Sequence, residues 1–277
     1  TEIIMIDYSE CQIVVSVSGG KDSSAMCLNL LQQGYSQNDF IRVFADTGWE
    51  DASTYEYLAY LEKTIGKIDH IKAEIAINEE YRESIEKIEA LLGFESPMIR
   101  QAYKYKFMSN PFQKWCTRVL KIQPFKKFFD SLDADPVNLV GIRREESPRR
   151  AKMQEWEFND PFDCWTHRPI IDWTEQQVID IHHEFNLLPN SLYLNGWNRV
   201  GCYPCIFSRK EEIKRISEER INIIEILETD LQASFFKPKN DQTATIRQVV
   251  EWSSRAGGAM QFMLFDTKKP TCSKWGL

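Results

Sequence analysis

Short apolar runs rich in Val, Ile and Phe alternate along this chain with longer segments in which apolar residues recur every three or four positions. The first kind of pattern predicts buried strands and the second predicts amphipathic helices. Strand-like runs lie at Gln12–Val17, Phe40–Ala45, Ile68–Ile75 and Val137–Ile142, and helix-like segments lie at Asp22–Gln33, Thr54–Ile65 and Thr117–Leu132. This alternation predicts an α/β fold, in which a mainly parallel twisted sheet has helices on both faces.

The pattern changes beyond Pro189. Gly201-Cys-Tyr-Pro-Cys205 is typical of a tight turn, Arg209–Leu231 of a charged amphipathic helix, and Asn240–Leu264 of a further helix. We therefore expect one α/β domain over residues 1–205 and a small helical C-terminal extension over residues 206–277.

Polar segments follow three of the predicted strands. They are Ser18–Ser23, Asp46–Glu50 and Gly141–Arg150. Because the carboxyl ends of parallel strands meet at one edge of a sheet, ligands of such folds bind there. We expect these three segments to line one site.

Composition limits the classes of function. The 277 residues are 43% hydrophobic and 27% charged, as in ordinary globular proteins. A net charge of −7 argues against broad coating of nucleic acid. A local basic cluster is still present, and it either meets phosphates or faces solvent. It consists of Arg143, Arg144, Arg149, Arg150 and Lys152. No apolar run approaches the roughly 20 residues that span a bilayer, and the N-terminal segment lacks the layout of a signal peptide. We expect a cytoplasmic protein without a membrane partner.

The segment Ser18-Gly-Gly-Lys-Asp-Ser23 carries the strongest chemical signal. Two glycines let backbone amides approach an anion closely, and the following helix offers its free amides and its positive dipole end. Lys21 adds a mobile cation, and the two serines add hydroxyl donors. The spacing is not that of the loop that serves γ-phosphate transfer, so a different cleavage of a nucleoside triphosphate is expected.

The hexapeptide resembles the PP-loop of the ATP pyrophosphatase superfamily, whose members form adenylated intermediates and release pyrophosphate. Three later segments extend the resemblance to the phosphoadenosine phosphosulfate (PAPS) reductase family, in the broad sense that includes the ATP sulfurylase small subunit. They are Asp46-Thr-Gly-Trp-Glu50 with Thr54-Tyr-Glu56, Gly141-Ile-Arg-Arg-Glu-Glu-Ser147, and Arg168-Pro-Ile-Ile-Asp-Trp-Thr-Glu175. The resemblance covers most of the chain, from Gln12 to Cys205, and implies an adenine nucleotide alpha hydrolase-like fold.

The resemblance also implies roles for matching residues. ATP would be held by Ser16, Ser18, Gly19, Gly20, Lys21, Asp22, Ser23, Asp46 and Gly141. Catalysis would fall to Lys21, Asp22, Asp46 and Arg143, with Asp46 near the nucleotide or its Mg²⁺. A structural alternative for Asp46 is a cap at the end of its strand.

The cysteines are a second group of candidate functional residues. The chain has seven of them, and an odd number without an export signal favours reduced thiols over a disulfide framework. In the adenosine phosphosulfate (APS) reductases, a Cys-Cys pair and a Gly-Cys-x-x-Cys turn hold a 4Fe–4S cluster. Here Trp115 replaces one member of the pair, so the resemblance leaves three ligands, Cys116, Cys202 and Cys205. A fourth would come from Cys164 or Cys272, or one iron would stay open. A zinc site or free redox thiols are the alternatives, and buried packing is expected for Cys11 and Cys27.

Cys272 is similar in position to the C-terminal nucleophile of sulfonucleotide reductases, but lacks that residue's Glu-Cys-Gly context. Those reductases usually carry a degraded phosphate loop, whereas this loop is intact. The combination of intact loop and cysteine turn is most similar to the ATP pyrophosphatase components of DNA phosphorothioation systems, and phage and mobile-element relatives of unknown substrate are equally compatible with it. It implies ATP cleavage to AMP and pyrophosphate to activate an acceptor for sulfur transfer, with DNA as an acceptor and a cysteine desulfurase or other sulfur donor as partner, in a chain that could form oligomers. The alternatives are an APS/PAPS-type reductase and a non-catalytic nucleotide-binding scaffold that recruits a desulfurase.

Overall fold

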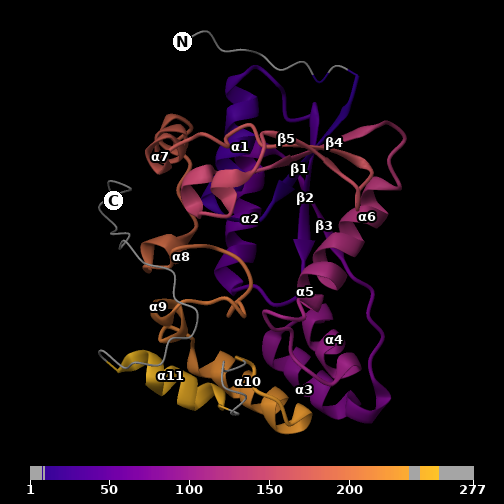
Figure 1. Ribbon diagram of the computed structural model, residues 1–277, viewed down its shortest axis with the longest axis vertical. Coiled ribbons are helices and arrows are strands. Elements are labelled where there is room, and N and C mark those ends of the chain that lie inside the picture. The colour runs from indigo at the N-terminus through magenta and orange to yellow at the C-terminus, as the bar shows by residue number, and fades with distance from the viewer. Residues whose placement is uncertain (1–7, 9, 237–243, 256–277) are drawn as a thin grey trace.

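A computed structural model describes residues 8, 10–236 and 244–255 and contains one six-stranded sheet (Figure 1). Its strand order is β3-β2-β1-β4-β6-β5. The strands are β1 (Gln12–Val17), β2 (Phe40–Asp46), β3 (Ile68–Lys72), β4 (Pro136–Val140), β5 (Trp156–Asn159) and β6 (Cys164–His167). Neighbouring strands are parallel except β5 and β6, which pair antiparallel. The predicted α/β class is confirmed.

Helices cover both faces of the sheet, as the sequence predicts (Figure 1). One face packs against α1 (Lys21–Gln32), α2 (Ala52–Ile65) and α7 (Glu175–Glu184). The opposite face packs against α6 (Gln123–Phe129), whose Phe125 and Phe129 share a hydrophobic cluster with residues of β1 and β2. Successive residues of β1 therefore belong to different clusters, with Val15 facing α1 and Val14 facing α6, as the pleat of a strand requires.

A second hydrophobic core lies beyond the carboxyl edge of the sheet. It is formed by α3 (Arg82–Leu92), α4 (Pro97–Tyr105), α10 (Glu218–Leu231) and α11 (Ile246–Ser254), with Trp49 fully buried among them. Figure 1 shows α10 beside α3, with α11 on the other side of α10. The C-terminal helices thus share a core with an earlier part of the chain, and a domain boundary at residue 205 stays a prediction.

Two predicted helices differ from the prediction: one is divided in two, and one is continuous to Phe129 but contains a π-helical turn. The segment predicted as Arg209–Leu231 contains α9 (Lys210–Ile213) and α10, because the Ser217 side chain accepts the Arg220 N–H and begins a new helix. The segment predicted as Thr117–Leu132 contains the end of α5 (Trp115–Thr117), a π-helical turn (Arg118–Ile122) and α6. Turns of this kind are frequent at functional sites.

The remaining elements are short. They are α8 (Ser191–Leu194) and the 3₁₀ turns Glu79–Tyr81, Arg144–Glu146 and Arg150–Lys152. Of the helix predicted over Asn240–Leu264, the described residues contain α11, and the rest lies outside them. Across the described part of the chain, no helix combines the length and the apolarity that crossing a bilayer demands.

Candidate functional site

The glycine loop joins the end of β1 to the start of α1. Gly19 has a φ of +70°, and Gly20 is the N-cap of α1. The Ser23 Oγ accepts the Ser18 N–H at 3.1 Å, lies 3.1 Å from the Ser18 Oγ and donates to the Gly20 carbonyl at 3.0 Å. These bonds fix the loop in a shape that presents backbone amides at the positive end of the helix dipole.

A side chain would be tightly confined at two glycines of the site, Gly19 and Gly20, and has no room at a third, Gly141. A Cβ on Gly19 would lie 3.0 Å from the Thr54 Cγ2, and its positive φ disfavours other residues. On Gly141, just after β4, a Cβ would lie 2.6 Å from the Asp22 carbonyl oxygen. On Gly20 it would meet the Tyr193 hydroxyl at 3.2 Å. The ends of β1 and β4 therefore meet at the first turn of α1, as expected from the sequence.

Arg143 connects the loop after β4 to this turn. Its side chain is buried, with 3% of the residue exposed. The Nε donates to the Asp22 Oδ1 at 2.5 Å, and one terminal nitrogen donates to Glu145 at 2.9 Å. Burial opposes the charge of Arg143, but the Asp22 carboxylate outweighs it and raises the pKa of the guanidinium.

Lys21 has its ammonium inside a small set of polar neighbours. The Nζ lies 3.8 Å from the Asp22 Oδ2 and 3.9 Å from the Glu175 Oε1, and it sits 4.8 Å from the centre of the Tyr193 ring. The Lys21 backbone N–H donates to the Tyr193 hydroxyl at 3.2 Å. Tyr193, on α8, thus lies directly over the amide that a phosphate would use.

His182, on α7, contacts the first turn of α1 through the Ser24 hydroxyl. Its Nδ1 faces the Val178 carbonyl at 2.6 Å and must donate to it, so the Nε2, at 2.8 Å from the Ser24 Oγ, accepts in the neutral ring. Burial lowers the pKa of His182 to about 4. The neutral imidazole therefore links α7 to the first turn of α1 by a hydrogen bond.

Asp46 ends β2 and is 2% exposed. Its Oδ1 accepts the Gly48 N–H at 2.8 Å and the Tyr55 hydroxyl at 2.8 Å, while its Oδ2 pairs with the Lys72 Nζ at 2.8 Å. Glu50, also buried, accepts from the same tyrosine at 3.2 Å. Burial and the two carboxylates raise the pKa of Tyr55. These contacts match the strand-end cap that was the structural alternative for Asp46.

Two other groups of predicted residues have structural partners. The Ser16 Oγ donates to the Asn138 Oδ1 at 2.9 Å, which links β1 to β4. Within the basic cluster, Arg144 pairs with Asp172 and Arg150 pairs with Glu146, whereas Arg149 and Lys152 are exposed. Exposed cations at this edge remain available to a ligand.

Asp22 is the carboxylate that lies in the phosphate loop itself. Mg²⁺ in nucleotide sites is held by phosphate oxygens and one or two carboxylates. Each candidate carboxylate is already paired with a cation. Arg143 holds the Asp22 Oδ1, so Asp22 could offer Mg²⁺ its Oδ2, which lies 3.8 Å from the Lys21 Nζ. Asp46 would have to release Lys72 before it could bind a cation.

Two of the three cysteines predicted as ligands, Cys116 and Cys202, pack against the same hydrophobic core, and all three influence Lys121, in the π-helical turn. The charge of Cys202 raises the pKa of the Lys121 ammonium most; burial opposes this shift, and Glu50, Cys205 and Cys116 add to it. The isolated bridge between Glu50 and Cys202 places the cysteine turn against the end of the β2 loop. Two segments that lie 86 residues apart in the chain, at Cys116 and at Cys202, thus contact the same core, whereas the binding of one ligand by their cysteines stays a prediction. The neighbouring Lys121 was not predicted.

The thiols are engaged with protein groups. The Ser109 Oγ donates to the Cys116 Sγ at 3.1 Å, and the Cys202 Sγ donates to the Glu50 Oε1 at 3.8 Å. Burial raises the pKa of Cys202 to about 12, although Lys121 opposes the shift. Among the described residues no group of three or more His, Cys, Asp or Glu side chains is placed to hold a metal ion. The arrangement therefore does not form a ready ligand set for a cluster.

The other cysteines lie apart from this group or outside the described residues. Cys164 is buried in β6 against α6, in a different hydrophobic cluster, and burial raises its pKa to about 11. Cys27 is buried, as expected, whereas Cys11 is exposed, so its predicted packing role is wrong. Cys11 comes just before β1, outside the sheet that would cover it. Cys272 lies outside the described residues.

Sequence reasoning missed several residues of the site: Glu50, Tyr55, Lys121, Glu175, His182 and Tyr193. Glu50 and Glu175 stand inside recognised motifs, which was a usable signal. Lys121 lies in the π-helical turn after Cys116, and Tyr193 lies on the short helix α8. No local sequence pattern predicts that either residue lies at the site.

Comparisons with known proteins identify the family of this chain. The sequence profile of the phosphoadenosine phosphosulfate reductase domain matches residues 12–208. An uncharacterised 37.8 kDa protein of Escherichia phage 186 is 34% identical over 251 residues, covering 76% of this chain and 73% of that protein. The adenosine 5′-phosphosulfate reductase of Burkholderia cepacia is 29% identical over 99 residues, 36% of this chain and 38% of the reductase.

One solved structure shares the fold. The crystal structure of a phosphoadenylyl-sulfate reductase from Candida auris, in a phosphate complex, superposes with a TM-score of 0.51 at 14% sequence identity. The superposition covers 71% of this chain and 84% of that one. At this identity the likeness concerns the fold alone.

Proposed function

This chain belongs to the phosphoadenosine phosphosulfate reductase domain family, and from that premise we propose that it is an ATP pyrophosphatase. It cleaves ATP between the α- and β-phosphates and adenylates an acceptor for sulfur transfer. The single observation that carries the proposal is the intact glycine loop, with Lys21 in its first helical turn and Arg143 bonded to Asp22.

The loop supplies the charge that a triphosphate needs. The amides from Gly19 to Ser23 and the dipole of α1 face the phosphates, and the Lys21 Nζ neutralises the β- and γ-groups once it leaves Glu175. The Tyr193 hydroxyl must yield the Lys21 amide to a phosphate oxygen. Mg²⁺, held by the phosphates and Asp22, would add charge stabilisation.

The reaction follows from this arrangement. An acceptor oxygen attacks the α-phosphorus, the bond from that phosphorus to the α,β-bridging oxygen breaks, and pyrophosphate leaves with the electron pair. Negative charge grows on the leaving group, where the loop amides and Lys21 stabilise it. A hydrosulfide-equivalent sulfur nucleophile then attacks the activated acceptor and displaces AMP, so that sulfur replaces the oxygen that AMP carries away.

Cys116, Cys202 and Cys205 are the residues we assign to sulfur handling. Two placements support the assignment: the turn of Cys202 and Cys205 lies against Glu50 at the end of the β2 loop, and all three thiols raise the pKa of Lys121. A thiolate is the nucleophilic form of cysteine. Burial keeps Cys202 in the thiol form and Lys121 opposes this effect, so Cys202 must lose its proton before it can act as a nucleophile. Because these thiols do not form a ready ligand set for metal, no step is routed through an iron–sulfur cluster.

Pyrophosphate release separates this proposal from a nucleotide-binding scaffold. Purified protein is incubated with ATP, Mg²⁺ and a candidate acceptor, and both ATP binding and pyrophosphate are measured. The proposal expects binding and acceptor-stimulated release, each weakened by Lys21→Ala. ATP binding without any pyrophosphate, with every acceptor class, would favour the scaffold.

A further inference from the structure

Tyr193, on α8, joins two parts of the molecule through one oxygen atom. Its hydroxyl accepts the Lys21 N–H at 3.2 Å, and a Cβ on Gly20 would lie 3.2 Å from it, so the hydroxyl lies at the start of α1. Burial raises the pKa of this hydroxyl, and hydrogen bonds from the backbone of Lys21 and of Val200 oppose the shift. The phenol oxygen therefore bridges the phosphate loop and the segment that leads into the cysteine turn.

A small hydrophobic cluster connects α8 to the cysteine turn. Leu192, Trp197 and Tyr203 are buried in it, and Val200 packs against them. The Trp197 and Tyr203 rings meet edge to face with their centres 5.3 Å apart, and the Trp197 N–H donates to the Leu192 carbonyl at 3.0 Å. Because Tyr203 belongs to the cysteine turn, α8 and that turn pack as one unit.

On its other side the cysteine turn meets the loop after β2. The Cys202 Sγ donates to the Glu50 Oε1 at 3.8 Å and lies 3.8 Å from the Thr47 Oγ1. Glu50 itself is fixed by shorter bonds, since it accepts the Thr47 hydroxyl at 2.8 Å and the Trp49 N–H at 3.1 Å. Cys202 is therefore the loosely held partner of a firmly held carboxylate.

The cysteine turn has one stronger attachment to the same loop. The Tyr203 N–H donates to the Trp49 carbonyl at 2.7 Å, whereas the Cys202 sulfur reaches Glu50 only at 3.8 Å. Burial raises the pKa of Cys202 to about 12; Lys121 opposes this shift, and the charge of Glu50 adds to it. A movement of the turn about the stronger bond would part Cys202 from Glu50 and favour the thiolate, which is the reactive form.

We propose that Tyr193 is a positioning residue that couples the filling of the phosphate loop to the release of the Cys202 thiol. A phosphate oxygen that takes the Lys21 amide displaces the Tyr193 hydroxyl, and α8 then shifts together with the cysteine turn. ATP favours the shifted arrangement because only that arrangement leaves the amide to the phosphate. The inference rests on the proposed function, which it deepens by naming a regulation of the same site: the thiol becomes reactive only while the triphosphate is bound.

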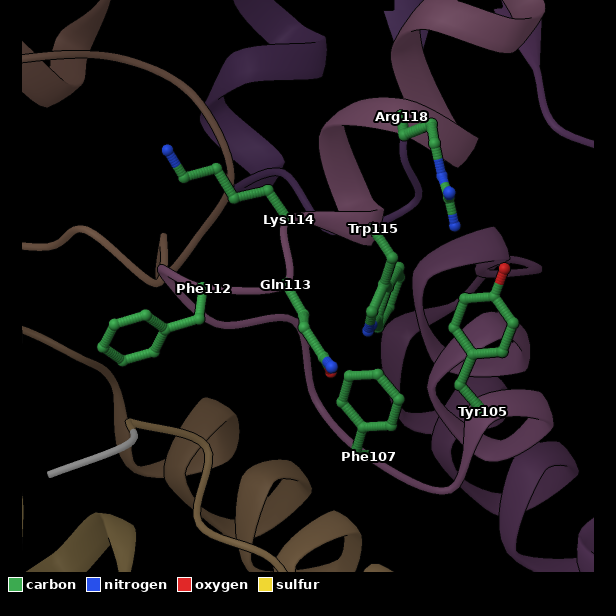
Figure 2. Close-up of a pocket in the computed structure, with 7 residues that line it drawn as sticks. All are labelled: Tyr105, Phe107, Phe112, Gln113, Lys114, Trp115 and Arg118. Atoms are coloured by element: carbon green, nitrogen blue, oxygen red, sulfur yellow. The ribbon is translucent and has the colours of Figure 1, made fainter. Parts of the chain in front are cut away.

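Cys116 provides an internal reference for this coupling. It follows Trp115, which lies in the wall of an open cavity of about 580 Å³ (Figure 2), and its sulfur accepts from the Ser109 hydroxyl at 3.1 Å. Trp115 packs in a different hydrophobic cluster from Tyr203. Nucleotide should therefore raise the alkylation rate of Cys202 relative to that of Cys116, whereas a general loosening of the protein would raise both rates.

Timed alkylation with peptide mapping tests the proposal in the presence of Mg²⁺ and the ATP analogue that has a methylene bridge between its α- and β-phosphates. This analogue fills the loop but cannot be cleaved at that bridge. It should raise the alkylation rate of Cys202 on the order of tenfold relative to Cys116, because the thiolate is the reactive form. Pyrophosphate should act in the same way, whereas AMP, which has no β-phosphate, should leave the ratio unchanged.

Tyr193→Phe keeps the aromatic ring and removes the hydroxyl that joins the loop to Val200. In this variant Cys202 should react rapidly without nucleotide, and the analogue should add little. Tyr60→Phe is the matched control, because the Tyr60 hydroxyl also accepts a backbone N–H, that of Leu188 at 3.2 Å. The control should respond to the analogue like the unaltered protein.

Unchanged or slower alkylation of Cys202 with the analogue bound, an equal effect of AMP, or equal behaviour of Tyr193→Phe and Tyr60→Phe would each overturn the coupling. Nucleotide titration establishes that the analogue is bound, and failure of both the analogue and pyrophosphate to bind would defeat the coupling and the proposed function together. Faster alkylation without pyrophosphate release from ATP defeats only the proposed function. Pyrophosphate release without faster alkylation defeats only this inference.

Discussion

The Arg143 Nε donates a hydrogen bond of 2.5 Å to the Asp22 Oδ1, and this bond ties the end of β4 to the first turn of α1. The two residues are 121 positions apart in the chain. Because the bond offsets the negative charge of Asp22, the carboxylate can stay beside incoming phosphates without repelling them. The shape and the charge of the phosphate loop thus depend on β4 as well as on β1.

Gly141 lies where β4 approaches the first turn of α1, and an added side chain there would clash with the backbone of α1. A methyl group there would lie 2.6 Å from the Asp22 carbonyl oxygen, so Gly141→Ala must push α1 away from β4. We expect the free energy of unfolding to fall by about 1–3 kcal/mol, as for other overpacked sites, and ATP affinity to fall with it. Denaturant titration and nucleotide titration measure the two effects.

Gly201→Ala is the matched control, since a Cβ there meets no atom within 4 Å. The control should leave stability and ATP affinity close to those of the unaltered protein. If Gly141→Ala behaves in the same way, the close approach of β4 to α1 does not exist in solution.

Lys21 is predicted to supply charge to the transition state. Lys21→Ala removes the cation of the loop, and we expect pyrophosphate release to slow on the order of 10²-fold or more. Lys127→Ala removes an exposed lysine on α6 that pairs with Glu74, and should not change the rate. Equal rates for the two variants would place the reaction elsewhere in the molecule.

His182 should make stability dependent on pH. Its pKa is about 4 in the folded protein because it is buried, against an ordinary value of 6.5. Below pH 6.5 the His182 side chain binds a proton in the unfolded chain but not in the folded protein. The stability that the neutral, buried His182 contributes is therefore complete above pH 6.5 and is lost as the pH falls toward 4. The loss amounts to about 3 kcal/mol of the free energy of unfolding. Asp22 reduces the shift, whereas Lys21 and His183 add to it.

His182→Gln keeps a polar side chain that does not titrate, so the stability difference between this variant and the unaltered protein should shrink as the pH falls from 6.5 to 4. Urea titrations at several pH values measure it. His183→Gln, on the exposed face of the same helix, is the control. A difference that does not change with pH would mean that His182 takes up its proton equally well in the folded and the unfolded state.

Lys121 should control the reactivity of Cys202. The ammonium opposes the effect of burial, so Lys121→Met should raise the pKa of the thiol further and slow its alkylation. Peptide mapping after a timed alkylation gives the rate at Cys202 alone, and Lys126→Met, on the exposed side of α6, is the control. Faster alkylation in Lys121→Met would show that the lysine shields the thiol instead of activating it.

The same mapping tests the iron–sulfur cluster predicted from the sequence. After anaerobic reconstitution with iron and sulfide, the cluster predicts coloured protein in which Cys116, Cys202 and Cys205 resist alkylation, and Cys202→Ala loses the colour but keeps ATP binding. Binding would require the thiols to leave Ser109 and Glu50. Colourless, iron-free protein with reactive thiols would contradict the cluster and leave the ATP site intact.

The sheet could be predicted from the sequence because its strands are continuous apolar runs followed by polar turns. Local signals also located the glycine loop and the cysteine turn. The single helix predicted over Arg209–Leu231 was wrong because Ser217 caps a new helix inside an otherwise helical pattern. The surroundings of Lys21 and Cys202 depend on Tyr193 and Lys121, which arrive through tertiary contacts that no spacing along the chain records.

The position at which ATP is cleaved tests the central claim most directly. ATP labelled separately in the α- and γ-phosphates is incubated with the protein, Mg²⁺ and a candidate acceptor, and the products are separated. The account predicts that the γ-label appears in pyrophosphate and the α-label in AMP or on the acceptor, with both signals lost in Lys21→Ala. The γ-label in orthophosphate, together with the α-label in ADP, would contradict it.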